Sequence, residues 1–122
     1  MAWKFDEKSP IYAQIAKYIK LQIISHAIKS GEQLPTVRDF AEEAGVNPNT
    51  MQRAFTELEH EGIVYSQRTA GRYVTEDTDL IAQKRQEVAQ AELQTFVSNM
   101  LKIGLNREDI LPALEHYLKE AN

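Results

Sequence analysis

Four polar residues stand close together in the middle of the chain, at the start of a segment with helical periodicity. They are two amides, a hydroxyl and a guanidinium: Asn49, Thr50, Gln52 and Arg53. Side chains of these types hydrogen-bond to base edges and phosphates in the major groove of DNA. The same pattern also fits an ordinary amphipathic helix with a solvated polar face. Taken alone, the pattern favours that simpler interpretation.

The elements around these residues would place them at the exposed end of a helix. Asn47 is a suitable N-cap and Pro48 suits the first helical position, while Met51, Phe55 and Leu58 recur at spacings of four and three and define a buried stripe. The preceding helix is short, begins after a capping-box pattern of Thr36 with Asp39, and ends at Gly45. A turn this short between two helices predicts helix-turn-helix geometry.

Two further elements flank this pair of helices. Isoleucines spaced by four predict a first helix over residues 10–27, with Ser9 as its cap and Pro10 in its first turn. After Gly62, residues 63–65 and 72–74 are strand formers on either side of a polar turn over 67–71, which predicts a β-hairpin, or wing. Arg68 and Arg72 bracket its tip and could reach a phosphate or a minor groove, or simply aid solubility.

The C-terminal segment reads as two helices, over about 80–103 and from about 107 onward. Its apolar positions include the residues that we expect to form a dimer interface: Val88, Phe96, Met100, Leu111, Leu114 and Leu118. Two helices cannot bury this much apolar surface against each other, so it must pack on the first domain or on a second chain. We favour a second chain. We therefore expect a DNA-binding domain over 1–75 and a helical dimerisation segment over 76–122.

Composition narrows the class of protein. The chain has 122 residues, no cysteine and a formal net charge of −4, and all of the excess acidity lies beyond residue 75. No signal peptide or run long enough to span a bilayer is visible, so we expect a cytoplasmic protein with no membrane contact. The three histidines have no metal-ligand spacing, and no phosphate loop or nucleophile motif occurs. We expect no enzyme activity, no cofactor and no metal.

A set of motifs in fixed order carries a resemblance to a known family. PIY-x-QI, LPTVR, DFAEEAGV and NT-x-x-RAF-x-x-LE-x-x-G follow one another over residues 9–75. Together they resemble the winged helix-turn-helix domain of GntR-type bacterial transcription regulators. The short two-helix tail and the NPNT turn are similar to the YtrA-type branch, in which the tail serves dimerisation and genes for ABC transporters are frequent targets.

The resemblance implies which residues contact operator DNA. They come from the second helix, the recognition helix and the wing: Thr36, Arg38, Asn47, Asn49, Thr50, Gln52, Arg53, Arg68, Thr69 and Arg72. Many members have Ser-Arg where this chain has Asn47-Pro48, so readout of the base sequence should rest more on Asn49, Thr50 and Gln52. The wing reads RTAGRY in place of the common G-x-G pattern.

These observations together predict a mainly α fold with a small β-hairpin, an α+β winged helix-turn-helix domain followed by a two-helix dimerisation tail. The predicted function is a homodimeric transcription repressor that binds double-stranded DNA at a palindromic operator. The alternative is a winged helix that binds another protein, which would expose apolar anchors on the recognition turn. A small-molecule effector is left open. Trp3 and Phe5 could form a ligand patch or a DNA-reaching arm, or pin the N-terminus to the core.

Overall fold

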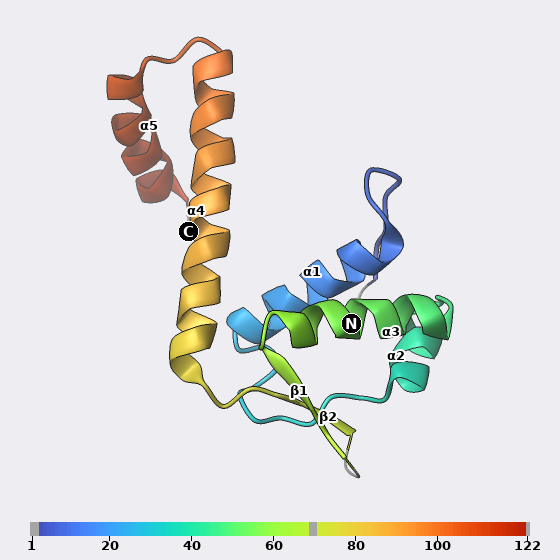
Figure 1. The fold of residues 1–122 in the computed structure, drawn as a ribbon. Helices are drawn as coiled ribbons and strands as arrows, with labels where there is room; N and C mark the ends of the chain where they lie inside the picture. Colours follow the sequence, from blue (N-terminus) through green and yellow to red (C-terminus); the bar gives the residue numbers. More distant parts are fainter. Residues whose placement is uncertain (1–2, 69–70, 122) are drawn as a thin grey trace. The chain divides into compact units, whose positions relative to one another are not determined.

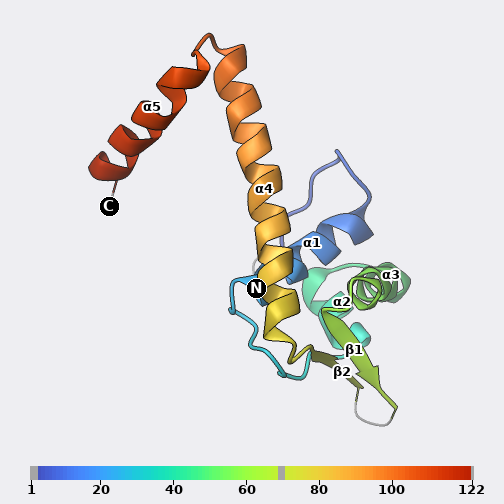
Figure 2. The same ribbon diagram turned by 60° about the vertical axis from the view of Figure 1, so that its left-hand side comes forward.

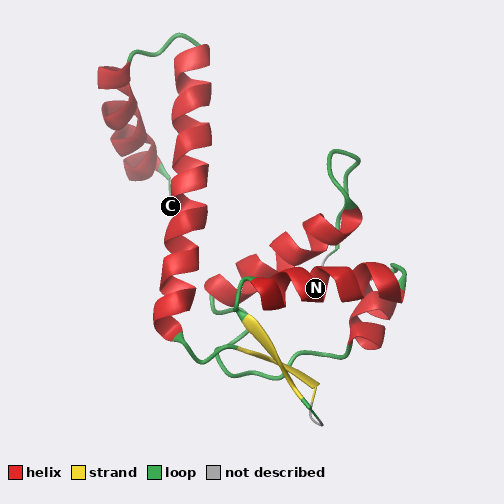
Figure 3. Cartoon of the chain, viewed as in Figure 1, coloured by secondary structure: helices red, strands yellow, loops and turns green. Residues whose placement is uncertain are grey.

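The computed structural model describes residues 3–68 and 71–121 of the chain. Its elements follow one another as α1 (Ile11–Ile24), α2 (Val37–Ala44), α3 (Pro48–His60), β1 (Val64–Gln67), β2 (Gly71–Val74), α4 (Thr78–Lys102) and α5 (Arg107–Glu120) (Figure 1). Helices make up most of the described chain, as the sequence predicts (Figure 3). The chain divides into two compact units, one running to Arg85 and the other beginning at Gln86. The division falls within α4.

Helix α1 is shorter than its apolar pattern predicts. The isoleucines at a spacing of four are fully buried from the second onward. The helix begins after Pro10 and no side chain caps it, so the predicted cap from Ser9 is wrong. It ends at Ile24, and not at Ala27, because His26 takes a left-handed backbone conformation with φ of 65°.

Helices α2 and α3 begin and end where local signals place them. The Thr36 hydroxyl accepts a hydrogen bond of 3.0 Å from the Asp39 amide at the start of α2. Gly45 ends α2 with a positive φ of 71°, a conformation that favours glycine. Asn47 caps α3 and Pro48 is its first residue. The predicted helix-turn-helix is confirmed, and the two helices lie against each other (Figure 2).

The core of the first unit lies between α1, α2 and α3. The buried face of α3 consists of Met51, Ala54, Phe55 and Leu58. Phe55 packs edge-on against Phe40 of α2 with ring centroids 5.9 Å apart. Trp3 stacks on Tyr18 of α1 at 4.8 Å and meets the edge of Phe40, so this aromatic pins the N-terminal segment to the core. Burial of this face leaves the opposite, polar face of α3 at the surface.

The wing is a two-stranded antiparallel hairpin whose pairs run from Val64 with Val74 to Gln67 with Gly71. Both residues at the ends of the predicted turn are therefore paired, and the tip is shorter than the sequence suggests. The extended segment over 32–34 lies along β2 and exchanges backbone hydrogen bonds of 2.9 Å with it. This third segment ties the start of the helix-turn-helix to the base of the wing.

The second unit contains the rest of α4 and all of α5. None of its described residues is buried. Leu111, Tyr117 and Leu118 of α5 keep 63%, 66% and 61% of their surface exposed. A hollow of about 290 Å³ between the two helices has an almost wholly apolar lining, formed by Phe96, Met100, Ala113, Leu114 and Tyr117. This unit thus has a large apolar surface and no interior of its own.

Candidate nucleic-acid interface

The first turns of α3 present polar side chains to solvent. The carboxamide oxygen of Asn47 accepts a hydrogen bond of 2.7 Å from the Asn49 amide, so the Asn47 side chain acts as the helix cap. Asn49 and Gln52 are exposed, and Thr50 is half-buried. Amides at two exposed positions of one helix end are suited to hydrogen-bonding base edges.

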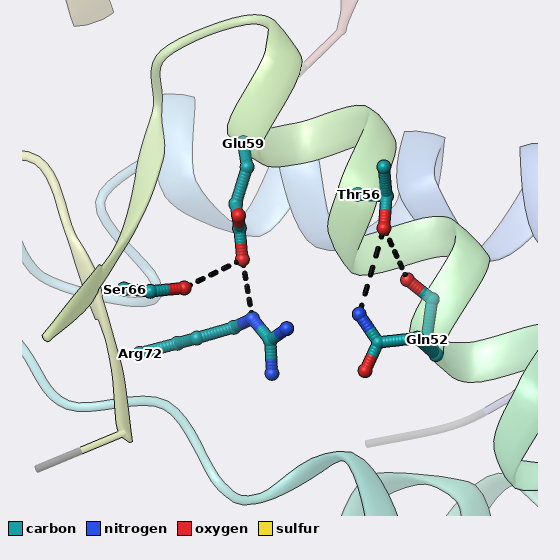
Figure 4. Close-up of polar contacts among 5 residues, drawn as sticks. All are labelled: Gln52, Thr56, Glu59, Ser66 and Arg72. Carbon is teal, nitrogen blue, oxygen red and sulfur yellow. Dashed lines mark hydrogen bonds and ion pairs between the residues drawn. The ribbon is translucent and has the colours of Figure 1, made fainter. Parts of the chain in front are cut away.

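Gln52 also has a neighbour on its own helix. The Thr56 hydroxyl donates to the Gln52 carbonyl at 3.0 Å and lies 3.5 Å from its side-chain nitrogen (Figure 4). The second contact is at the limit of hydrogen-bond distance. The Gln52 amide is therefore weakly held and remains at the surface.

Arg53 is positioned by a residue that the sequence did not single out. Its guanidinium carbon lies 3.8 Å from the ring centroid of Tyr12 in the first turn of α1. This is a cation–π contact, which holds the charge in place without neutralising it. The two side chains line an open hollow of about 320 Å³ together with Ile11, Asn49 and Thr50. The aromatic in the PIY motif, next to a proline helix start, was the available signal for Tyr12.

At the start of α2, the Thr36 side chain caps the helix and the guanidinium side chain of Arg38 is exposed. The first amides of a helix carry a partial positive charge, so they and Arg38 would attract a phosphate together. Arg38 therefore lies at a helix end that suits a contact to a DNA phosphate. Thr36 has the capping role that the sequence predicts.

The wing residues differ from one another in their surroundings. Arg68 is exposed at the end of β1, and Thr69 lies outside the described residues. Arg72 lies one residue pair further from the tip than the sequence suggests, because it pairs across the hairpin with Ser66. Its Nε donates to the carboxylate of Glu59 on α3 (Figure 4), and its Cζ lies 5.2 Å from the ring centroid of Phe55. Glu59 is a second residue that sequence reasoning missed.

The charges of the first unit separate into two groups. Arg72 pairs with Glu59 in the last turn of α3, and Lys20 and Lys84 pair with Glu61, the C-cap residue of that helix. In contrast, the other predicted DNA-contacting cations, Arg38, Arg53 and Arg68, form no ion pair within the described part of the chain. Local positive charge is thus retained near the N-terminal ends of α2 and α3 in a chain that is acidic overall.

Comparison with known proteins identifies this arrangement. The family described as "Bacterial regulatory proteins, gntR family" matches residues 11–74. The chain belongs to the GntR family. It is similar over most of its length to two Bacillus subtilis proteins. The uncharacterized HTH-type transcriptional regulator YhcF is 32% identical, covering 93% of this chain and 94% of the relative. The HTH-type transcriptional repressor YtrA is 30% identical, covering 92% and 84%.

Solved structures of similar proteins agree with the fold. A GntR family transcriptional regulator from Listeria monocytogenes is 38% identical, with a TM-score of 0.84 and coverage of 97% of this chain and 100% of that one. The DNA-binding domain of AraR in complex with operator ORX1 is 25% identical, with a TM-score of 0.57 and coverage of 62% and 96%. The match to the Listeria regulator confirms the predicted winged helix with a C-terminal helical region.

These comparisons confirm the predicted class of function as well. The GntR-family relatives are transcription regulators and not enzymes, so this chain is a DNA-binding transcription regulator of the helix-turn-helix type. Within the part of the chain that the structure describes, no helix has the length and apolarity to cross a membrane.

Proposed function

We propose that the chain is a homodimeric repressor that reads a palindromic operator with the first turns of α3. The observation that carries this proposal is the polar, exposed N-terminal end of α3, where Asn49 and Gln52 face solvent while the opposite face of the helix is buried. A helix presented in this way can enter a major groove end-on. The operator complex of AraR supports the same use of the domain.

Two sets of side chains have different tasks in this proposal. Asn49, Thr50 and Gln52 choose bases, since amides and hydroxyls bond to base edges. The remaining contacts set the position of the protein on the phosphate backbone of the DNA. They come from the capped ends of α2 and α3, from arginine side chains and from the wing: Thr36, Arg38, Asn47, Arg53, Arg68, Thr69 and Arg72. The hold of Tyr12 on Arg53 supports such a contact because it preserves the charge.

The wing and α3 offer little to a protein partner. Large apolar side chains that are exposed within the described residues lie on α1 and in the second unit, and none lies on α3 or in the wing. A protein-binding winged helix would be expected to present such anchors there. This distribution favours DNA over protein as the partner of the first unit.

The second unit provides the proposed dimer contact. Its interface would include Val88, Phe96, Met100, Leu111, Leu114 and Leu118. Exposed leucines beside an apolar hollow form a surface that a symmetry-related copy can cover. In a two-fold dimer the same surface of each copy would pack against the other copy. Two winged domains would then bind half-sites about 34 Å apart, one helical turn of DNA.

The biological setting follows from the relatives. YtrA of Bacillus subtilis is named a repressor, which favours repression for this chain, and resemblance to that branch makes ABC transporter genes the proposed targets. A regulator of this kind acts on chromosomal DNA, and we accordingly propose a cytoplasmic location. The hollow in the second unit is assigned to the partner helix and not to a small-molecule effector.

Binding to a selected operator tests the proposal. The full chain would be used to enrich duplexes from random DNA, and its affinity for the enriched sequence would be compared with a scrambled duplex at several salt concentrations. Arg38→Ala should weaken binding to both duplexes and lower the slope of log affinity against log salt by about one unit. Asn49→Ala should reduce discrimination between the duplexes and leave the slope unchanged.

Lys29→Ala provides the matched control, since Lys29 is an exposed cation outside the proposed surface. It should preserve both affinity and slope. If random DNA yields no enriched sequence, the claim of specific binding fails. If Arg38→Ala leaves both affinity and slope unaltered, the backbone contact is wrong.

A further inference from the structure

A single carboxylate joins the recognition helix to both strands of the wing. Glu59, in the last turns of α3, accepts a hydrogen bond from Nε of Arg72 on β2 (Figure 4). The same oxygen, Oε1, accepts a second hydrogen bond of 2.9 Å from the hydroxyl of Ser66 on β1. Ser66 and Arg72 are directly opposite each other in the hairpin. Glu59 therefore binds the wing through one cross-strand pair.

This pair lies near the end of the wing that carries the exposed Arg68. Only the pair of Gln67 with Gly71 separates it from the tip. The segment over 32–34 supports β2 through backbone hydrogen bonds along the edge of β2 that does not pair with β1. A two-stranded hairpin is at best marginally stable by itself, so side-chain contacts to the helix decide where its tip lies.

The same contact fixes the direction of the Arg72 guanidinium. Nε is occupied by Glu59, and Cζ lies 5.2 Å from the ring centroid of Phe55. The terminal nitrogens lie on the side of the guanidinium away from Glu59, and one of them points to the side on which Gln52 is drawn (Figure 4). A guanidinium has four N–H donors on these two atoms, arranged to bind a phosphate or a guanine edge.

We infer that Glu59 is a positioning residue for DNA binding. It holds the wing against α3 and presents the terminal nitrogens of Arg72 to the DNA beside Gln52. This inference rests on the proposed function of the α3 surface and adds to it a role for an acidic residue that does not itself touch DNA. It also makes a distinctive prediction, because removal of a negative charge near DNA ordinarily strengthens binding.

The test compares variants of the full chain on the enriched operator across a salt series. Glu59→Ala should weaken binding about fivefold, the effect of losing one partly exposed ion pair. It should also lower the slope of log affinity against log salt by the same amount as Arg72→Ala. Without Glu59 to position it, the Arg72 guanidinium no longer makes its contact with the DNA. Glu59→Gln should restore most of the affinity, because the amide oxygen still accepts from Arg72 and Ser66.

The control is Glu57→Ala, which removes an exposed carboxylate from the same helix. It should leave operator affinity unchanged or raise it slightly. The double variant Glu59→Ala with Arg72→Ala should bind no more weakly than Arg72→Ala alone, because both changes abolish one contact.

Several results would overturn the inference while the proposed function stands. Operator affinity of Glu59→Ala at or above that of the unaltered chain is one, and additive losses in the double variant are another. A salt slope unchanged by Glu59→Ala, with affinity lost, would show a structural role only. If instead the unaltered chain enriches no operator, the proposed function itself fails.

Discussion

The substitution Leu118→Glu should convert the proposed dimer into a monomer. Leu118 lies on α5 with 61% of its surface exposed, beside Leu111 and Tyr117 in the second unit, which has no buried residue among those described. Complete burial of a leucine side chain contributes roughly 1.5–3 kcal/mol. Burial of the part of Leu118 that is still exposed would therefore contribute about 1–2 kcal/mol of dimerisation free energy for each copy.

A symmetric interface doubles this effect. Each change in sequence occurs twice in a dimer with a two-fold axis, so the loss of apolar burial amounts to about 2–4 kcal/mol. The dimer dissociation constant should rise roughly thirty- to a thousandfold. Burial of an unpaired carboxylate would add a further penalty, which makes this range a minimum.

Sedimentation at several protein concentrations measures the outcome. His116→Glu is the matched control, because it adds the same negative charge two residues away, about 200° around the helix. Circular dichroism would show that both variants keep their helices. The variant Leu118→Glu should also bind the operator more weakly, since one winged domain then binds at a time. If it stays dimeric with an unaltered dissociation constant, this face of α5 is not the interface.

Two further substitutions test the framework that supports the recognition helix. Phe55 is fully buried and packs edge-on against Phe40, so Phe55→Ala should lower the free energy of unfolding by about 3–5 kcal/mol in a urea titration; an unshifted midpoint would contradict this. Asn47→Ala removes the 2.7 Å cap of α3 and should cost about 1 kcal/mol in the same assay. Asn47→Asp keeps a capping oxygen and should retain the stability; an equal loss would show that the cap is unimportant.

Features that depend on near neighbours in sequence were predicted well. The caps at Thr36 and Asn47 each join atoms two or three residues apart, and Gly45 ends its helix through its own backbone. Such interactions are encoded locally, because the residues meet whenever the helix forms. The order of helices, turn and hairpin followed from these signals together with the apolar spacing.

Features that depend on packing were missed or misplaced. Glu59 and Arg72 are 13 residues apart and meet only once the wing has folded back along α3. Tyr12 and Arg53 belong to different helices, so their contact depends on how α1 packs on α3. The end of α1 was also misplaced, since the left-handed conformation of His26 is uncommon for any residue other than glycine and has no strong local signal.

The distribution of charge along α3 explains how an acidic chain can use this helix on DNA. Its last turn carries Glu59 and its C-cap is Glu61, and these carboxylates are paired with cations from the wing, α1 and α4 and so link these elements. Its N-terminal part carries amides, a hydroxyl and Arg53, which packs on Tyr12 and has no ion-pair partner among the described residues. A phosphate would be repelled at one end and attracted at the other. The helix is therefore expected to approach a groove by its N-terminus and not to lie flat along it, which leaves the carboxylates outside the groove and free to hold the wing.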